Sequence, residues 1–163
     1  MGSKAVSNTG PIIHLTEINL IRILTIFQNI TIPEEVEEEL IKNKVSIPKK
    51  IKITQLRPES KDKTKILTNE YNLDLGEAEA ISLALQEKSD YFLTDDLGAR
   101  QIAKEYNIET HGTIGIILRA FKERLIGREI TIEKIKELKT NSSLFITQDL
   151  ISAVVESVKN FRG

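Results

Sequence analysis

The chain has 163 residues, of which 40% are hydrophobic and 29% charged, with 23 basic against 24 acidic side chains. This composition is typical of one globular domain and excludes a disordered chain, a collagen-like repeat and a globally basic nucleic-acid coat protein. Cysteine is absent, which excludes disulfides, Cys-based zinc sites and thiol nucleophiles. No apolar run approaches the roughly 20 residues of a membrane helix and no secretory leader is recognised, so we expect a cytoplasmic protein with no membrane contact.

The strands and helices predicted from the sequence alternate. Strands are expected at residues 4–7, 29–32, 51–56, 91–94 and 108–111. Helices are expected from Pro11, at the first helical position, to about Ile18, then at residues 20–27, 33–42, 59–71, 76–88, 96–106 and 113–125, and from Thr131 onward with one break at 141–143. The alternation predicts an α/β fold in which helices sandwich a parallel β-sheet. We expect a single domain, 1–163, with residues 131–163 as a helical C-terminal extension packed on it.

Charge is distributed unevenly along the chain. Residues 42–65 contain nine Lys or Arg and two acids, whereas residues 34–39 contain five glutamates in six positions. Two explanations stay open. The segments are solvated faces, or they form a basic rim beside an acidic pocket, which would suit a metal-dependent enzyme acting on a polyanion.

Polar residues follow two of the predicted strands directly. Asn8 comes after the first strand, and Asp95 and Asp96 come after the strand at 91–94. In a parallel sheet the carboxyl ends of the strands share one edge, where ligands bind. Turn chemistry offers another explanation for each residue, because Asn and Asp favour strand-to-helix junctions and Asp96 is placed to cap the next helix.

Two glutamates lie near the apolar faces of their helices. Glu77 stands three, four, seven and eight residues before Ala80, Ile81, Ala84 and Leu85, at the head of a buried stripe. A capping role in the first turn is the alternative for this carboxylate. Glu39 lies next to Leu40 at the apolar edge of its helix, whereas Glu79 and the other glutamates of residues 34–38 are expected to point elsewhere.

Four segments can therefore bring Asn8, Glu39, Glu77 and Asp96 to one edge of the sheet. Carboxylates packed together repel one another, and burying them unpaired is costly. A hard divalent cation with oxygen ligands relieves that cost, and this reasoning indicates Mg²⁺ or Mn²⁺.

The sequence resembles PIN-domain proteins, a small metal-dependent ribonuclease fold used by many prokaryotic toxins of toxin–antitoxin pairs. The resemblance covers nearly the whole chain. It is carried by residues 6–13 (VSNTGPII), 32–40 (IPEEVEEEL), 75–81 (LGEAEAI), 93–96 (LTDD) and 111–115 (HGTIG). It implies an acidic pocket that holds one or two divalent ions and activates water for attack on an RNA phosphodiester.

The resemblance also implies roles for individual residues. Asp96 would be a direct or water-mediated metal ligand, Asp95 would support or substitute for it, and Glu77 would be the acid at the start of its helix. Glu39 would orient the attacking water. Asn8 occupies a position where aspartate is usual, with Thr9 as the nearby hydroxyl. Asparagine still offers an oxygen to a cation but removes one negative charge, so metal affinity and activity are expected to be reduced.

The main alternative function is a catalytically impaired PIN domain that acts as a nucleic-acid or protein binding module, and Asn8 favours it. RNA, single-stranded or looped, is the expected partner in either case. The basic residues of 42–65, with Arg100 and Lys104, would bind phosphates. His14 is expected to be a packing or surface residue, and His111 is a weaker candidate for substrate contact. An antitoxin or a second copy of the chain could bind an early apolar patch formed by Ile13, Ile21, Leu24 and Phe27, which core packing explains equally well.

Overall fold

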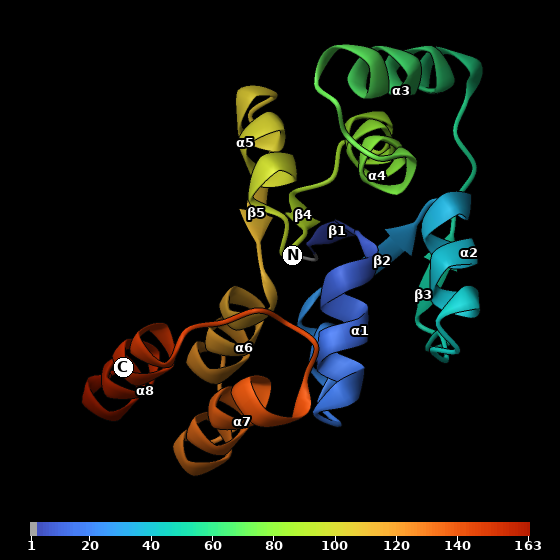
Figure 1. Ribbon diagram of the computed structural model, residues 1–163. Coiled ribbons are helices and arrows are strands. Elements are labelled where there is room, and N and C mark those ends of the chain that lie inside the picture. The colour runs from blue at the N-terminus through green and yellow to red at the C-terminus, as the bar shows by residue number, and fades with distance from the viewer. Residues whose placement is uncertain (1–2) are drawn as a thin grey trace.

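The computed structural model describes residues 3–163, and their strands form one parallel five-stranded sheet in the order β3-β2-β1-β4-β5 (Figure 1). The strands are β1 (Lys4–Ser7), β2 (Asn29–Ile32), β3 (Ile51–Ile53), β4 (Tyr91–Leu93) and β5 (Glu109–His111). β1 is central, pairing with β2 on one side and with β4 on the other.

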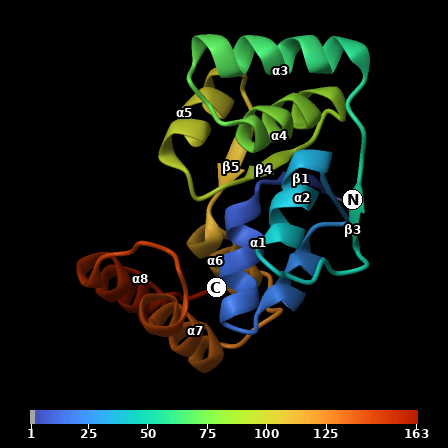
Figure 2. The ribbon, with the colours of Figure 1, turned by 45° about the vertical axis from the view of Figure 1, so that its right-hand side comes forward.

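Helices cover both faces of the sheet. They are α1 (Thr9–Glu17), the 3₁₀ helix η1 (Ile21–Ile26), α2 (Glu34–Lys42), α3 (Pro58–Glu70), α4 (Leu75–Gln86), α5 (Leu97–Glu105), α6 (Thr113–Lys122), α7 (Arg128–Asn141) and α8 (Gln148–Asn160). Figures 1 and 2 show α3, α4 and α5 on one side of the sheet and α1 and α6 on the other, with α7 and α8 beyond α6. α2 contacts both α1 and α4 at the end of the sheet.

The two middle strands are covered on both faces, and each has consecutive buried apolar residues, Ala5 and Val6 in β1 and Phe92 and Leu93 in β4. The outer strands differ: β2 and β3 alternate apolar with polar residues, and β5 is polar. Val6, Ile32, Phe92 and Leu93 are fully buried. α4 lies between the sheet and α3 and is buried almost all round, and its small residues allow both neighbours to approach closely. Burial of this apolar surface is the main favourable contribution to folding.

The order in which strands are added to the sheet reverses at β1, between β1 and β4. From β1 the chain proceeds outward through β2 and β3, and it then returns to the other side of β1 for β4 and β5. α1 and α5, which follow the two central strands, therefore lie on opposite faces and diverge at the carboxyl edge (Figure 1). This topological switch point is where doubly wound sheets bind ligands.

The predicted α/β fold is confirmed, with small corrections at element ends. The first helix begins at Thr9 rather than Pro11, because Asn8 caps it and Pro11, without an N–H, is tolerated anywhere in the first turn. The third strand ends at Ile53 rather than Leu56. The C-terminal break is longer than predicted, since α8 begins only at Gln148. Over residues 3–163, no helix has the length and apolarity needed to cross a bilayer.

Candidate metal and nuclease site

Asn8 joins the ends of the two central strands. Its Oδ1 accepts a hydrogen bond from the Thr9 amide (2.9 Å) and so caps α1, and its Nδ2 donates to Thr94 Oγ1 (3.4 Å). The same Thr94 oxygen accepts from the Asp96 amide at 3.1 Å. Asn8 and the Asp96 amide thus share one acceptor, the Thr94 hydroxyl oxygen. The Asn8 contact depends on an N–H donor that an aspartate side chain lacks.

Glu39 reaches from α2 to the first turns of α1 and α4. Its Oε2 accepts a hydrogen bond from Thr9 Oγ1 at 2.6 Å. Its other oxygen lies against Gly76, where any Cβ atom would overlap Glu39 Oε1. Gly76 is therefore required for this carboxylate to approach α4 so closely, and the helix accepts the glycine because it stands in the first turn.

Glu77 performs the capping role and also carries a perturbed carboxyl group. Its amide donates to Asp74 Oδ1 (2.8 Å) while its Oε2 accepts from the Asp74 amide (3.3 Å), which is a complete capping box. Burial first, and then the negative charges of Asp74, Asp96 and Glu39, raise the pKa of Glu77 to about 7. The two interpretations of Glu77 from the sequence are therefore compatible.

Asp96 lies at the exposed side of this group of acids. Its Oδ2 accepts from the Ala99 amide at 2.7 Å, so the expected cap on α5 is present. Its charge also contributes to the raised pKa of Glu77, which places the two carboxylates in one electrostatic neighbourhood. Glu79 is not part of this group, because its Oε1 accepts from the Glu35 amide at the start of α2.

The donor set matches a hard divalent cation in chemical type. Glu39, Glu77 and Asp96 supply carboxylate oxygens and Asn8 an amide oxygen. Burial is the largest cause of the raised pKa of Glu77, and a cation would offset the charge repulsion that adds to it. Within residues 3–163, no three His, Asp or Glu side chains converge into a ready-made metal site. A cation bound by Asn8, Glu77 and Asp96 would therefore require these side chains to rotate away from their capping hydrogen bonds.

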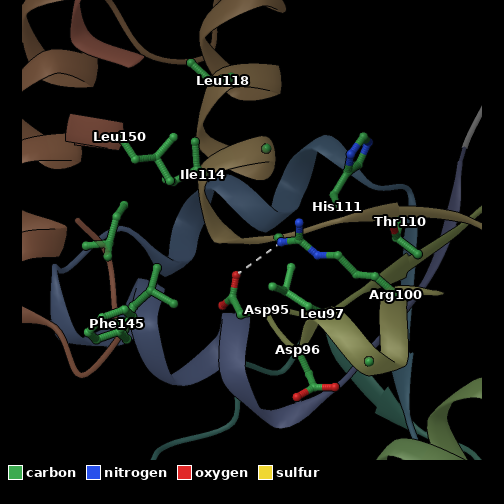
Figure 3. A pocket seen from close by; sticks show the side chains of 15 residues that line it. Asp95, Asp96, Leu97, Arg100, Thr110, His111, Ile114, Leu118, Phe145 and Leu150 are labelled. Atoms are coloured by element: carbon green, nitrogen blue, oxygen red, sulfur yellow. Dashed lines mark ion pairs between the residues drawn. The ribbon is translucent and has the colours of Figure 1, made fainter. Parts of the chain in front are cut away.

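Asp95 has a different environment from Asp96. His14 Nδ1 lies 2.7 Å from Asp95 Oδ2, and Thr113 donates to both Asp95 oxygens, from its amide to Oδ1 (2.7 Å) and from its hydroxyl to Oδ2 (2.5 Å). Arg100 adds a longer ion pair at 3.8 Å (Figure 3). Although burial opposes ionisation, the hydrogen bonds from His14 and Thr113 outweigh it and lower the pKa of Asp95. Of the two roles expected for Asp95, support of the site suits this geometry better than metal ligation.

The other residues singled out from the sequence have different environments. His111 stacks on Tyr91 at 4.9 Å, and its pKa is lowered by burial and by nearby Arg119. Lys104 is exposed on α5. The early apolar patch is mostly core: Leu24 and Phe27 are buried, and Ile13 and Ile21 are partly buried and packed against the core.

Three features of the site were not predicted from the sequence. His14 was expected to be a packing residue, yet it pairs with Asp95, 81 positions away along the chain. Gly76 was not singled out, and no local pattern reveals a close approach between two helices. A capping role for Glu77 was one of the two predictions, but its partner Asp74 was not named, although an Asp three residues before a Glu at the start of a helix is typical of a capping box.

The fold and this site define an α/β protein with carboxylates gathered at the switch point of a parallel sheet. A family model described as a PIN domain matches residues 4–160. The chain belongs to the PIN-domain family, as the resemblance implied, and proteins of this family are generally nucleases that use divalent metals. Comparison with curated protein sequences gave no match.

Proposed function

We propose that this PIN domain is a metal-dependent endoribonuclease that hydrolyses RNA phosphodiester bonds with Mg²⁺ or Mn²⁺. The observation that carries the proposal is the meeting of Glu39 and Glu77 at the first turn of α4, where Glu39 Oε1 lies against Gly76 and where burial and the neighbouring acids raise the pKa of Glu77 to about 7. Strongly perturbed pKa values of this kind cluster at functional sites. A purely structural capping box needs Asp74 but not the two further carboxylates nearby, Glu39 and Asp96.

The residues divide the proposed work between them. Asn8, Glu77 and Asp96 would hold the cation, with Asp95 supporting the turn that carries Asp96. When bound, a divalent ion polarises a phosphate oxygen and lowers the pKa of water. Glu39, whose carboxylate is oriented by the Thr9 hydroxyl at 2.6 Å, would accept a proton from the attacking water. No histidine is needed as the base.

The test is a Mn²⁺ titration by calorimetry combined with cleavage of a fluorescent single-stranded RNA. Asp96→Asn keeps the N-cap, since asparagine caps helices as well as aspartate, but removes a charge. We expect Mn²⁺ binding and cleavage to fall at least about 10-fold in Asp96→Asn and to remain unchanged in the control Asp149→Asn, which alters an exposed acid on α8. Equal activity in Asp96→Asn would refute the site assignment.

The second candidate function is a disarmed PIN domain that binds RNA or protein without cleaving. It is supported by Asn8, whose amide donates to Thr94 and whose side chain brings no charge. If the wild type neither binds Mn²⁺ nor cleaves while Asn8→Asp does both, the site is built but disarmed. Failure of both proteins would leave a binding module.

The biological setting we propose is that of a cytoplasmic toxin with an antitoxin partner, acting as a homodimer. Support comes from the toxin-like subfamily that the sequence resembles. Light scattering on the purified chain tests the dimer. Co-purification with the product of an adjacent gene tests the antitoxin.

A further inference from the structure

A hollow of about 760 Å³ opens beside Asp95 and Asp96 at the carboxyl edge of the sheet. One wall is formed by α5, β5 and α6, and the other by residues 144–150, which join α7 to α8 and begin α8. Figure 3 shows Arg100 and Phe145 on opposite sides of this space. Its volume is within the range of pockets that hold small organic ligands.

The hollow is lined by apolar side chains that the fold does not require to be there. Phe145 is 91% exposed and Leu97 is 76% exposed, so neither contributes to the core. Leu150, also exposed, and Ile114 line the same space. Exposed apolar residues that gather around a concavity are typical of binding sites. A phenyl ring held on an irregular segment offers a flat face for stacking.

Arg100 gives the hollow a positive group with free donors. Its Nε donates to the Thr94 carbonyl at 3.0 Å, which fixes the side chain, while Nη2 is 3.8 Å from Asp95. Asp95 already receives hydrogen bonds from Thr113 and contacts His14. At 3.8 Å it leaves N–H donors of the Arg100 guanidinium available to a ligand. An apolar platform beside a cation matches a nucleotide, which combines a flat ring with an anionic phosphate.

A second hollow, of about 420 Å³, has charges of both signs. Lys61 and Lys65 of α3 line it together with Glu34 and Glu79. It is lined from α3, from the starts of α2 and α4 and from the segment after β3, whereas the apolar hollow is lined mainly from α5, β5 and α6. Lysines at the second hollow would add phosphate contacts that do not depend on base sequence.

We propose that the apolar hollow binds an unpaired nucleobase of the RNA, stacked on Phe145 and next to the phosphodiester to be cut. This inference rests on the proposed ribonuclease function. Bases inside a duplex are already stacked and cannot enter, so the hollow selects single-stranded or looped RNA. The specificity it provides is for an unpaired base, with Arg100 contacting the adjacent phosphate.

The experiment measures binding separately from cleavage. Anisotropy of a fluorescein-labelled single-stranded RNA decamer in EDTA reports affinity without metal or turnover. We expect Phe145→Ala to weaken binding by about 5- to 100-fold, the range for loss of one base–aromatic stack, and Leu97→Ala to weaken it less. Leu125→Ala, a control at a 46% exposed leucine outside the hollow, should bind like the wild type. A decamer of abasic residues should bind the wild type and Phe145→Ala equally.

The outcomes separate this inference from the proposed function. If Phe145→Ala weakens RNA binding while no protein cleaves with Mn²⁺, the hollow stands and the nuclease assignment fails. If all variants bind RNA alike, or if the wild type does not bind the decamer, the nucleobase site is wrong. A dimer in light scattering that becomes monomeric in Phe145→Ala, with RNA affinity unchanged, would instead identify the hollow as an interface between copies of the chain.

Discussion

The two neighbouring aspartates after β4 show how one turn can serve two purposes. Asp95 points toward α1 and α6, where His14, Thr113 and Arg100 surround it and its pKa is lowered. Asp96 caps α5 on the other side, where burial and the charges of Asp74, Asp96 and Glu39 raise the pKa of Glu77 to about 7. The first side of the edge is electrostatically satisfied, because its carboxylate faces a histidine and an arginine. The second side is electrostatically unsatisfied, because it brings negative charges together, and the cation that we propose would offset their repulsion.

Removing Asp95 should have the largest effect on stability. Asp95→Ala leaves His14 and the Thr113 groups without their partner in a setting where both ion-pair side chains are only 12% exposed. We expect a loss of about 2–4 kcal/mol in the free energy of unfolding, because a buried partner is left unpaired. Urea denaturation measures it, with Asp62→Ala on the exposed side of α3 as control. If Asp95→Ala lowers the free energy of unfolding no more than the control does, the contacts of Asp95 do not stabilise the fold.

Neutralising Glu77 should have a smaller effect of opposite sign. Glu77 binds its proton more tightly when folded (pKa about 7) than at its ordinary value of 4.5, so the folded state takes up protons between these values. The stability of the wild type therefore falls as pH rises from 4.5 to about 7, and the penalty is complete above that range. Glu77→Gln keeps an acceptor for the capping box and removes the penalty.

The expected gain for Glu77→Gln is about 1–2 kcal/mol at pH 8 in EDTA, discounted for the partial exposure of the group, and close to zero at pH 4.5. Urea denaturation of both proteins at the two pH values measures it. Saturating Mn²⁺ should stabilise the wild type at pH 8 and stabilise Glu77→Gln less. A pH-independent difference between the proteins would contradict the idea of an unsatisfied acidic group.

The sequence predicted the unsatisfied side of the edge better than the satisfied side. Asn8, Glu77 and Asp96 stand at strand ends or in first helical turns, and strand topology alone brings such positions to one edge. The alternation of strand and helix patterns likewise predicted the fold, because parallel strands need helical connections that cross over the sheet. Only the exact ends of elements, such as the start of α1 at Thr9, depended on local capping.

The rest depends on contacts between distant segments. His14 sits on an apolar helix, and nothing near it in the sequence indicates a carboxylate partner 81 residues later. The hollow lined by Leu97 and Phe145 forms only because the segment between α7 and α8 returns to the sheet edge. The distances between such segments follow from the packing of α6 against α7, which hydrophobic periodicity does not specify.

A substitution at Gly76 should separate the stability of the fold from the proposed catalytic role of Glu39. Its expected effect on stability is the smallest of the three. A Cβ at this position would overlap Glu39 Oε1, the mobile end of a side chain rather than backbone. In Gly76→Ala the carboxylate must move away from α4, while the helix gains intrinsic propensity of up to about 1 kcal/mol. Thermal unfolding should therefore show stability unchanged to within about 1 kcal/mol.

The same displacement should weaken the proposed chemistry, because a shift of about 1 Å in a positioned group can cost up to about 100-fold in rate. We expect RNA cleavage by Gly76→Ala to fall about 10- to 100-fold, and its Mn²⁺ affinity in calorimetry to fall less, since Asp96 and Glu77 are left in place. The matched control is Ala78→Gly, the opposite exchange at a buried position two residues further along α4. This variant should be less stable than the wild type but should cleave RNA at the wild-type rate. If Gly76→Ala cleaves RNA at the wild-type rate, Glu39 does not need its observed position, and the role proposed for it in accepting the proton of water is wrong.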